Sequence, residues 1–106
     1  MYARSVSLHL KANSAAEFTR AIEEEVIPLL RKQEGFLDEV TLAVPGGTEA
    51  VGISLWDRKE SAETYNRDTY PQVQKALSKV TEGTPAVKSY EVTNCTFHKI
   101  AAHAAA

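Results

Sequence analysis

Residues 35–65 read GFLDEVTLAVPGGTEAVGISLWDRKESAETY, which predicts two antiparallel strands, a tight turn and the start of a helix. Positions 36–44 are rich in the branched and aromatic residues that favour strands. The Pro-Gly-Gly at 45–47 ends the pairing, because proline has no N–H and glycine supplies the positive φ of a hairpin turn. Val51, Ile53 and Leu55 alternate with Gly52, Ser54 and Trp56, which predicts the second strand.

A helix is predicted to follow this hairpin directly. Asp57, with Glu60 three residues later, has the spacing of a capping box. Pro71 interrupts the helical pattern, so a second helical piece should start near it. The Glu-Gly-Thr-Pro at 82–85 ends that piece, and residues 86–97 form the last predicted strand. The apolar residues of this strand do not keep one phase, which indicates a bulge.

A strand and a helix are also predicted ahead of the hairpin. Residues 5–10 alternate between apolar and polar side chains, as a half-buried strand does. Ser14 opens a capping box, and the helix that follows carries one apolar stripe. Pro28 lies within this helix and should kink it or split off its last turn, and Gly35 is a natural end.

The predicted order is βαββαβ, which is typical of the ferredoxin-like α+β fold with a four-stranded antiparallel sheet. Right-handed crossovers place both helices on one face of the sheet. The other face is then bare, although it carries large apolar side chains. We therefore expect a homodimer that packs one open sheet face against the other.

The totals limit the class of protein. The chain of 106 residues predicts one domain, residues 1–100, and an alanine-rich disordered tail, residues 101–106. A net charge of −2 provides no broad attraction to nucleic acid or to an anionic membrane, so we expect neither partner. Cys95 is the single cysteine, and the sequence shows no signal-peptide core or membrane span, which together favour a cytoplasmic protein.

Small side chains on the strands predict a cavity. Gly52, Ser54 and the serines of the first strand are too small to fill the space above them. That space could lie between the sheet and the helices, or between the two sheets of a dimer. The phase of the strands favours the second position, because His9 and Trp56 both alternate with large apolar residues. A bulge at Trp56 would favour the first.

Several of these features together resemble a known family. They are Glu-Gly-Phe at 34–36, the strand at 51–56 that ends in tryptophan, the turn at 57–62 and the interrupted helix through Tyr70. Over roughly residues 3–97 the chain resembles the antibiotic biosynthesis monooxygenase-like family of dimeric α/β barrel proteins. The resemblance implies a dimer with a ligand cleft between the sheet and the second helix. Characterised members oxygenate polycyclic phenols or quinols without flavin or metal, or degrade haem.

The chain also departs from that pattern. Gly52 stands where some oxygenating members carry asparagine, and residues 70–75 lack the histidine that haem-degrading members use as axial ligand. Haem degradation is therefore disfavoured, and we expect no cofactor. His98 and His103 lack the spaced partners of a metal site, so we expect no metal.

The candidate catalytic residues are His9 and Tyr65. The ordinary pKa of histidine suits a general base, although a hydrogen-bonded interface histidine is the commoner role for a residue like His9. Tyr65 should face inward from the helix. By the resemblance Trp56 would stack on a flat substrate, although a tryptophan between a strand end and a helix start more often packs in the core. The other expected substrate-binding residues are Tyr70, Ser54 and Phe36, and core packing is the alternative for the tyrosines.

Two functions are compatible with these residues. The first is a cofactor-independent monooxygenase that acts on a flat phenolic or quinol substrate. The second is a non-catalytic, ligand-binding or stress-associated homodimer that uses the same slot for a small aromatic ligand. The sequence leaves open whether the chain is an enzyme.

Overall fold

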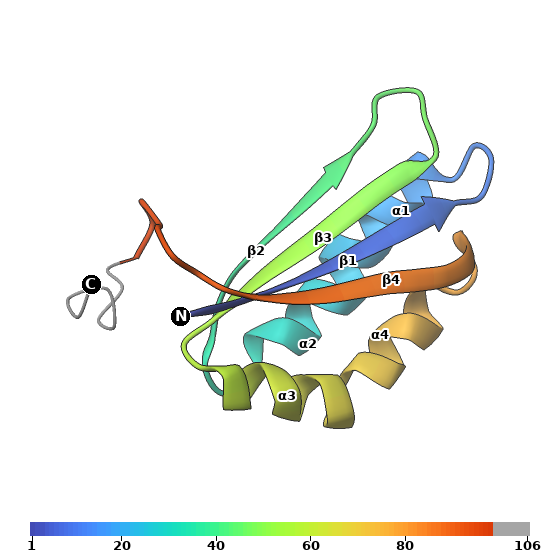
Figure 1. The fold of residues 1–106 in the computed structure, drawn as a ribbon. Helices are drawn as coiled ribbons and strands as arrows, with labels where there is room; N and C mark the ends of the chain where they lie inside the picture. The colour runs from blue at the N-terminus through green and yellow to red at the C-terminus, as the bar shows by residue number, and fades with distance from the viewer. Residues whose placement is uncertain (99–106) are drawn as a thin grey trace.

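The computed structural model describes residues 1–98 and confirms the ferredoxin-like α+β fold (Figure 1). The four strands form one antiparallel sheet in the order β2-β3-β1-β4, and the helices cover one of its faces. The expected disordered tail and His103 lie outside the described residues. The strands are β1 (Tyr2–Leu10), β2 (Phe36–Ala43), β3 (Glu49–Trp56) and β4 (Thr81–Glu91), and the helical segments are α1 (Ala15–Ala21), η1 (Ile22–Val26), α2 (Ile27–Arg31), α3 (Lys59–Asp68) and α4 (Tyr70–Leu77).

The predicted hairpin between β2 and β3 is confirmed. The N–H of Val44 donates to the carbonyl of Glu49 at 3.0 Å, and the N–H of Gly47 donates to the carbonyl of Val44 at 3.0 Å. Gly46 has φ +70, the left-handed conformation that glycine adopts without strain. The break at α3 and α4 is also where the sequence predicted it, with Pro71 in the first turn of α4.

The first helix deviates from the α form earlier than predicted. Pro28 lies in the first turn of α2, and the five residues before α2 form the π-helical segment η1. Proline has no N–H to donate to the carbonyl one turn earlier, so the hydrogen bonds of that turn follow another pattern. The irregularity therefore precedes Pro28 instead of splitting off the last turn.

The predicted capping boxes do not form. Ser14 occupies the N-cap of α1 but makes no capping bond, and its Oγ donates to the carbonyl of Ala12 at 3.4 Å. The N-cap of α3 is Arg58, one residue later than predicted, and Asp57 accepts a bond of 2.7 Å from Ser61 Oγ instead. Because Asp57 precedes the cap, its carboxylate reaches a side chain in the first turn and no backbone N–H.

The last strand starts and ends earlier in the chain than the sequence predicted. β4 begins at Thr81 and ends at Glu91, so it includes the segment 82–85 that was expected to end a helix. Gly83 has φ +73, and the pairing with β1 shifts by a bulge between Ser7 and His9. The predicted bulge is thus present, but it lies at the start of the strand and lets pairing continue there.

The register of β1 and β3 decides which side chains face the helices. Val6 pairs with Gly52, so Gly52, Ser54 and Trp56 share the inner face with the apolar residues of β1. The expectation that Trp56 and His9 share a face was therefore wrong. The bulge considered at Trp56 lies in the strand opposite it, in β2 between Phe36 and Asp38. No helix within residues 1–98 has both the length and the hydropathy needed to cross a membrane.

Candidate functional site

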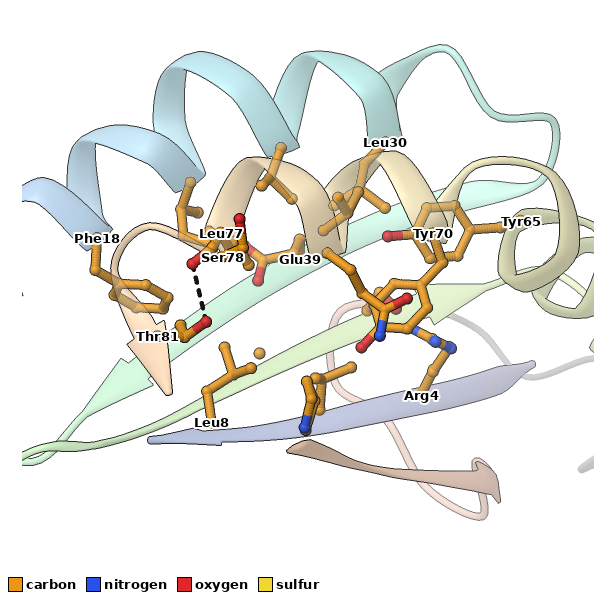
Figure 2. Close-up of a pocket in the computed structure, with 18 of the residues that line it drawn as sticks. Arg4, Leu8, Phe18, Leu30, Glu39, Tyr65, Tyr70, Leu77, Ser78 and Thr81 are labelled. Carbon is orange, nitrogen blue, oxygen red and sulfur yellow. Dashed lines mark hydrogen bonds between the residues drawn. The ribbon is translucent and has the colours of Figure 1, made fainter. Parts of the chain in front are cut away.

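A cavity of about 340 Å³ lies between the sheet and the helices (Figure 2). This location corrects the phase argument that favoured a space between two sheets. All four strands and all the helical segments contribute to its wall. Its middle is apolar and is formed by Val6, Leu8, Ile22, Val26, Leu30 and Val73.

The cavity exists because the inner face of the hairpin carries small residues. Gly52 and Ser54 of β3 line it, as their size suggested. A Cβ built on Gly52 would lie 3.6 Å from Glu39 Oε2, so the carboxylate of Glu39 uses the space that the glycine leaves free. Glu39 pairs with Ser54 across the hairpin and faces the same side.

Glu39 is a partly buried carboxylate in this wall. Thr41 Oγ1 donates a bond of 2.6 Å to its Oε2. Burial raises the pKa of Glu39, since removal from water disfavours the charged form, and the bond from Thr41 acts in the opposite direction. A carboxylate so placed binds a proton more readily than one in water.

Arg4 provides the opposite charge at the same end of the cavity (Figure 2). Its side chain comes from β1 and is buried, with only 3% of the residue exposed. Nη2 donates to Asn66 Oδ1 at 2.7 Å, and the guanidinium lies over Tyr70 at 4.0 Å and Tyr65 at 5.3 Å from the ring centroids. No carboxylate within residues 1–98 forms an ion pair with it. The aromatic faces stabilise a cation that has no acidic partner.

Tyr65 and Tyr70 complete this end. Burial raises the pKa of Tyr65 to about 12, with the charge of Arg4 opposing that shift. Burial also raises the pKa of Tyr70, again against the influence of Arg4. Both phenols therefore stay protonated near neutral pH, where they can donate hydrogen bonds but cannot accept a proton as bases.

Trp56 and Phe36 lie behind the wall. Trp56 is fully buried, and its Nε1 donates to Ser54 Oγ at 2.9 Å. Its ring packs on Tyr65 with centroids 5.0 Å apart, and Phe36 meets it edge-on at 5.6 Å. The structure thus brings Tyr65, Tyr70 and Ser54 to the cavity, while Trp56 supports Tyr65 from behind and Phe36 packs on Trp56.

His9 lies on the other face of the sheet, where it is exposed. It is absent from the cavity wall, so the structure does not bring it together with Tyr65. His98 contacts the carboxylate of Asp38 on that outer side. Among residues 1–98 no three His, Cys, Asp or Glu side chains are grouped so that they could hold a metal.

Sequence reasoning missed Arg4 and Glu39. Arg4 lies in phase with Val6 and Leu8, so it is a charge within an apolar stripe. Glu39 alternates with the exposed Val40 and therefore points inward with Thr41. A charged residue in the apolar phase of a strand was the signal that could have identified Arg4. Glu39 gave no such signal, because it lies in the polar phase of β2 and only the pairing with β3 turns that phase inward.

No family model matches the sequence, and no curated protein matches it. Solved structures do match in fold. SnoaB, a cofactor-independent oxygenase from Streptomyces nogalater, is 13% identical with a TM-score of 0.74, covering 90% of this chain and 95% of that one. A monooxygenase from the gene ActVA-Orf6 of Streptomyces coelicolor, in complex with nanaomycin D, is 16% identical with a TM-score of 0.74 and covers 92% of each chain.

A proposed antibiotic biosynthesis monooxygenase from Nitrosomonas europaea is 14% identical with a TM-score of 0.72, covering 89% of this chain and 100% of that one. The resemblance predicted from the sequence is confirmed for the fold. At these identities the likeness concerns the fold alone, and the chemistry must be argued from the cavity.

Proposed function

We propose that this protein is a small-molecule monooxygenase that oxygenates a flat phenolic or quinol substrate in the cavity, without a cofactor of its own. One observation carries the proposal: a cavity of about 340 Å³ with apolar walls ends in the buried cation of Arg4 and the carboxylate of Glu39. This volume falls in the range of small-ligand pockets. Proteins of the same fold include a cofactor-independent oxygenase and a monooxygenase bound to nanaomycin D, which supports the reaction type.

The two ends of the proposed ligand meet different surroundings. Its rings would lie among the branched aliphatic side chains of the middle, and its hydroxyl would lie near Arg4, Tyr65 and Tyr70. A guanidinium in a site of low polarity favours the phenolate over the phenol, and a phenolate is the electron-rich form that reduces oxygen. The neutral tyrosines would donate hydrogen bonds to the same oxygen.

The reaction balances without an external reductant. A ring CH₂, tautomeric with the phenol, becomes a carbonyl as one atom of O₂ enters the substrate. The other oxygen atom leaves as water with the two hydrogens of that carbon, so the substrate supplies all the electrons. The enclosed apolar walls would exclude bulk water from the reactive intermediate. His9 has no part in this scheme, because it lies on the opposite face.

We further propose that the protein acts as a homodimer in the cytoplasm. The outer face of the hairpin exposes Val40 and Leu42 by 47% and 53%, and Val51, Ile53 and Leu55 lie beside them on β3. A second copy of the same face is a complementary cover for such a surface. Cys95 is the only cysteine of the chain, so no internal disulfide can form, which supports a cytoplasmic location.

Oxygen uptake tests the proposal. A panel of polycyclic phenols and quinols is incubated with the protein in aerobic and anaerobic buffer, and oxygen consumption and product are measured. We expect one O₂ consumed per product and one labelled atom incorporated from ¹⁸O₂. Ligand-induced thermal stabilisation across the panel with no oxygen uptake would instead favour the ligand-binding alternative.

A further inference from the structure

The cavity needs a base near its charged end, and few groups in its wall can serve. The tyrosines stay protonated, and Arg4 is always a cation. Among the described wall residues, the carboxylates are Glu39 on β2 and Glu82 on β4. Figure 2 shows Glu39 beside Arg4 and Tyr70, whereas Thr81, the neighbour of Glu82, lies at the far end with Phe18.

One oxygen of Glu39 remains available. Oε2 accepts the bond from Thr41, and Oε1 has no hydrogen-bond partner among residues 1–98. No fully buried side-chain oxygen in this part of the chain lacks a partner, so Oε1 must reach open space. Because Glu39 is part of the cavity wall and lies beside Arg4 and Tyr70 (Figure 2), its free oxygen is within reach of a ligand at that end. The bond from Thr41 fixes the carboxylate in this orientation.

We infer that Glu39 is the general base of the proposed reaction and that its Oε1 accepts the proton of the substrate's phenolic hydroxyl. The O–H bond breaks, its electron pair stays on the phenolate oxygen, and the proton moves to Oε1. Arg4 then faces the new anion. The inference rests on the proposed function and assigns to one residue the removal of the hydroxyl proton from that substrate.

The surroundings of Glu39 suit this role. The charged or titratable groups that face it are Arg4 from β1, Tyr65 from α3 and Tyr70 from α4, while β3 contributes only Gly52 and Ser54. Burial raises the pKa of Glu39 and so moves it toward the working pH of a general base. Activity should therefore fall as pH decreases through this raised pKa, because the protonated acid cannot accept a proton.

A phenol with a visible phenolate gives a readout that does not depend on turnover. We would bind 7-hydroxycoumarin to the wild type and to Glu39→Gln, and titrate the bound probe by absorbance. In the wild type the carboxylate opposes the phenolate. The pKa of the bound probe should therefore fall by about one to three units when Glu39 becomes neutral. Glu39→Asp keeps the charge and should stay near the wild type.

Glu49→Gln is the matched control, since Glu49 is also a strand glutamate but is exposed. It should leave the pKa of the bound probe unchanged. Equal probe pKa values in the wild type and Glu39→Gln would overturn the inference, and so would failure of the wild type to bind the probe. Circular dichroism of each variant verifies that the fold is kept.

Turnover separates this inference from the proposed function. With a phenol that consumes oxygen, Glu39→Gln should lower kcat/KM by about a hundredfold or more and remove the acid limb of the pH profile. If the probe responds to Glu39 as expected but no phenol is oxygenated, the oxygenase proposal fails and the contact with the hydroxyl stands. If oxygenation proceeds equally in Glu39→Gln, the base assignment fails alone.

Discussion

Along residues 39–42 and 51–54 of the hairpin, the two faces of the sheet reverse the usual relation between polarity and burial. On the inner face, the hairpin presents Glu39, Thr41, Gly52 and Ser54 to the helices. On the outer face, the same two strands carry valine, isoleucine and leucine, of which Val40 and Leu42 are exposed. A hairpin that only packed a core would point its branched residues inward. The difference indicates that the inner face is shaped around a space and that the outer face is shaped to be covered.

The inner face is nevertheless where the stability of the subunit lies. Trp56 is fully buried, so Trp56→Ala should lower the free energy of unfolding by about 3–5 kcal/mol. Leu42→Ala, on the half-exposed outer face, should cost less than about 1 kcal/mol at concentrations where the chain is monomeric. Urea unfolding followed by circular dichroism measures both. Equal losses would remove the energetic distinction between the faces.

The charge on the inner face should matter for binding and little for folding. Arg4→Met replaces a buried cation that has no acidic partner by an apolar chain of similar length, so we expect stability within about 1 kcal/mol of the wild type. Phenolate binding should weaken about tenfold to a hundredfold with the loss of a charged hydrogen bond. Isothermal titration with a phenol probe tests this, and unchanged affinity would place the ligand elsewhere.

The outer face should matter for assembly. Leu42→Asp places a charge among the exposed apolar residues of β2 and β3, and we expect the dissociation constant of the dimer to rise about tenfold or more. Thr41→Asn, one residue away on the inner side, serves as the control for strand disruption. Analytical ultracentrifugation from nanomolar to micromolar concentration gives the answer. A wild type that stays monomeric throughout would contradict the assigned use of this face.

Glycine at position 52 keeps the cavity open at a modest cost in stability. Gly52→Ala adds a methyl group at ordinary contact distance from Glu39, and it should raise the free energy of unfolding by roughly 0.5 kcal/mol. The same change at Gly46, where φ is +70 and the surroundings are open, should cost about 1 kcal/mol. Thermal unfolding of the two variants compares them, and a destabilised Gly52→Ala would show a tighter site than the distance indicates.

The smallest effect concerns pH. The pKa of Glu39 is raised in the folded chain above its ordinary value of 4.5, so the folded state holds more protons than the unfolded state between the two values. The stability contributed by this group is present below about 4.5 and is lost as pH rises through the folded pKa. The difference in urea midpoint between wild type and Glu39→Gln should change in that window. A difference independent of pH would show that the carboxylate is fully hydrated.

The sequence predicted the fold of this molecule more closely than the residues of its site. Proline and glycine at 45–47, and Pro71, have local effects, so the hairpin and the break between α3 and α4 could be predicted. The positions of β4 and of Trp56 depend on how strands pair, and pairing register is a property of two segments at once. Without Val6 opposite Gly52, nothing fixed which face held His9 and which held Glu39. Arg4 and Glu39 meet only after that register is set.

Trp56 also has a practical consequence for experiments on this protein. It is the only tryptophan of the chain, it is shielded from water, and it contacts two residues of the cavity wall, Tyr65 and Ser54. Its emission should therefore be blue-shifted in the native protein. A coloured aromatic compound in the cavity would quench that emission by resonance energy transfer, so ligand screening needs no attached dye.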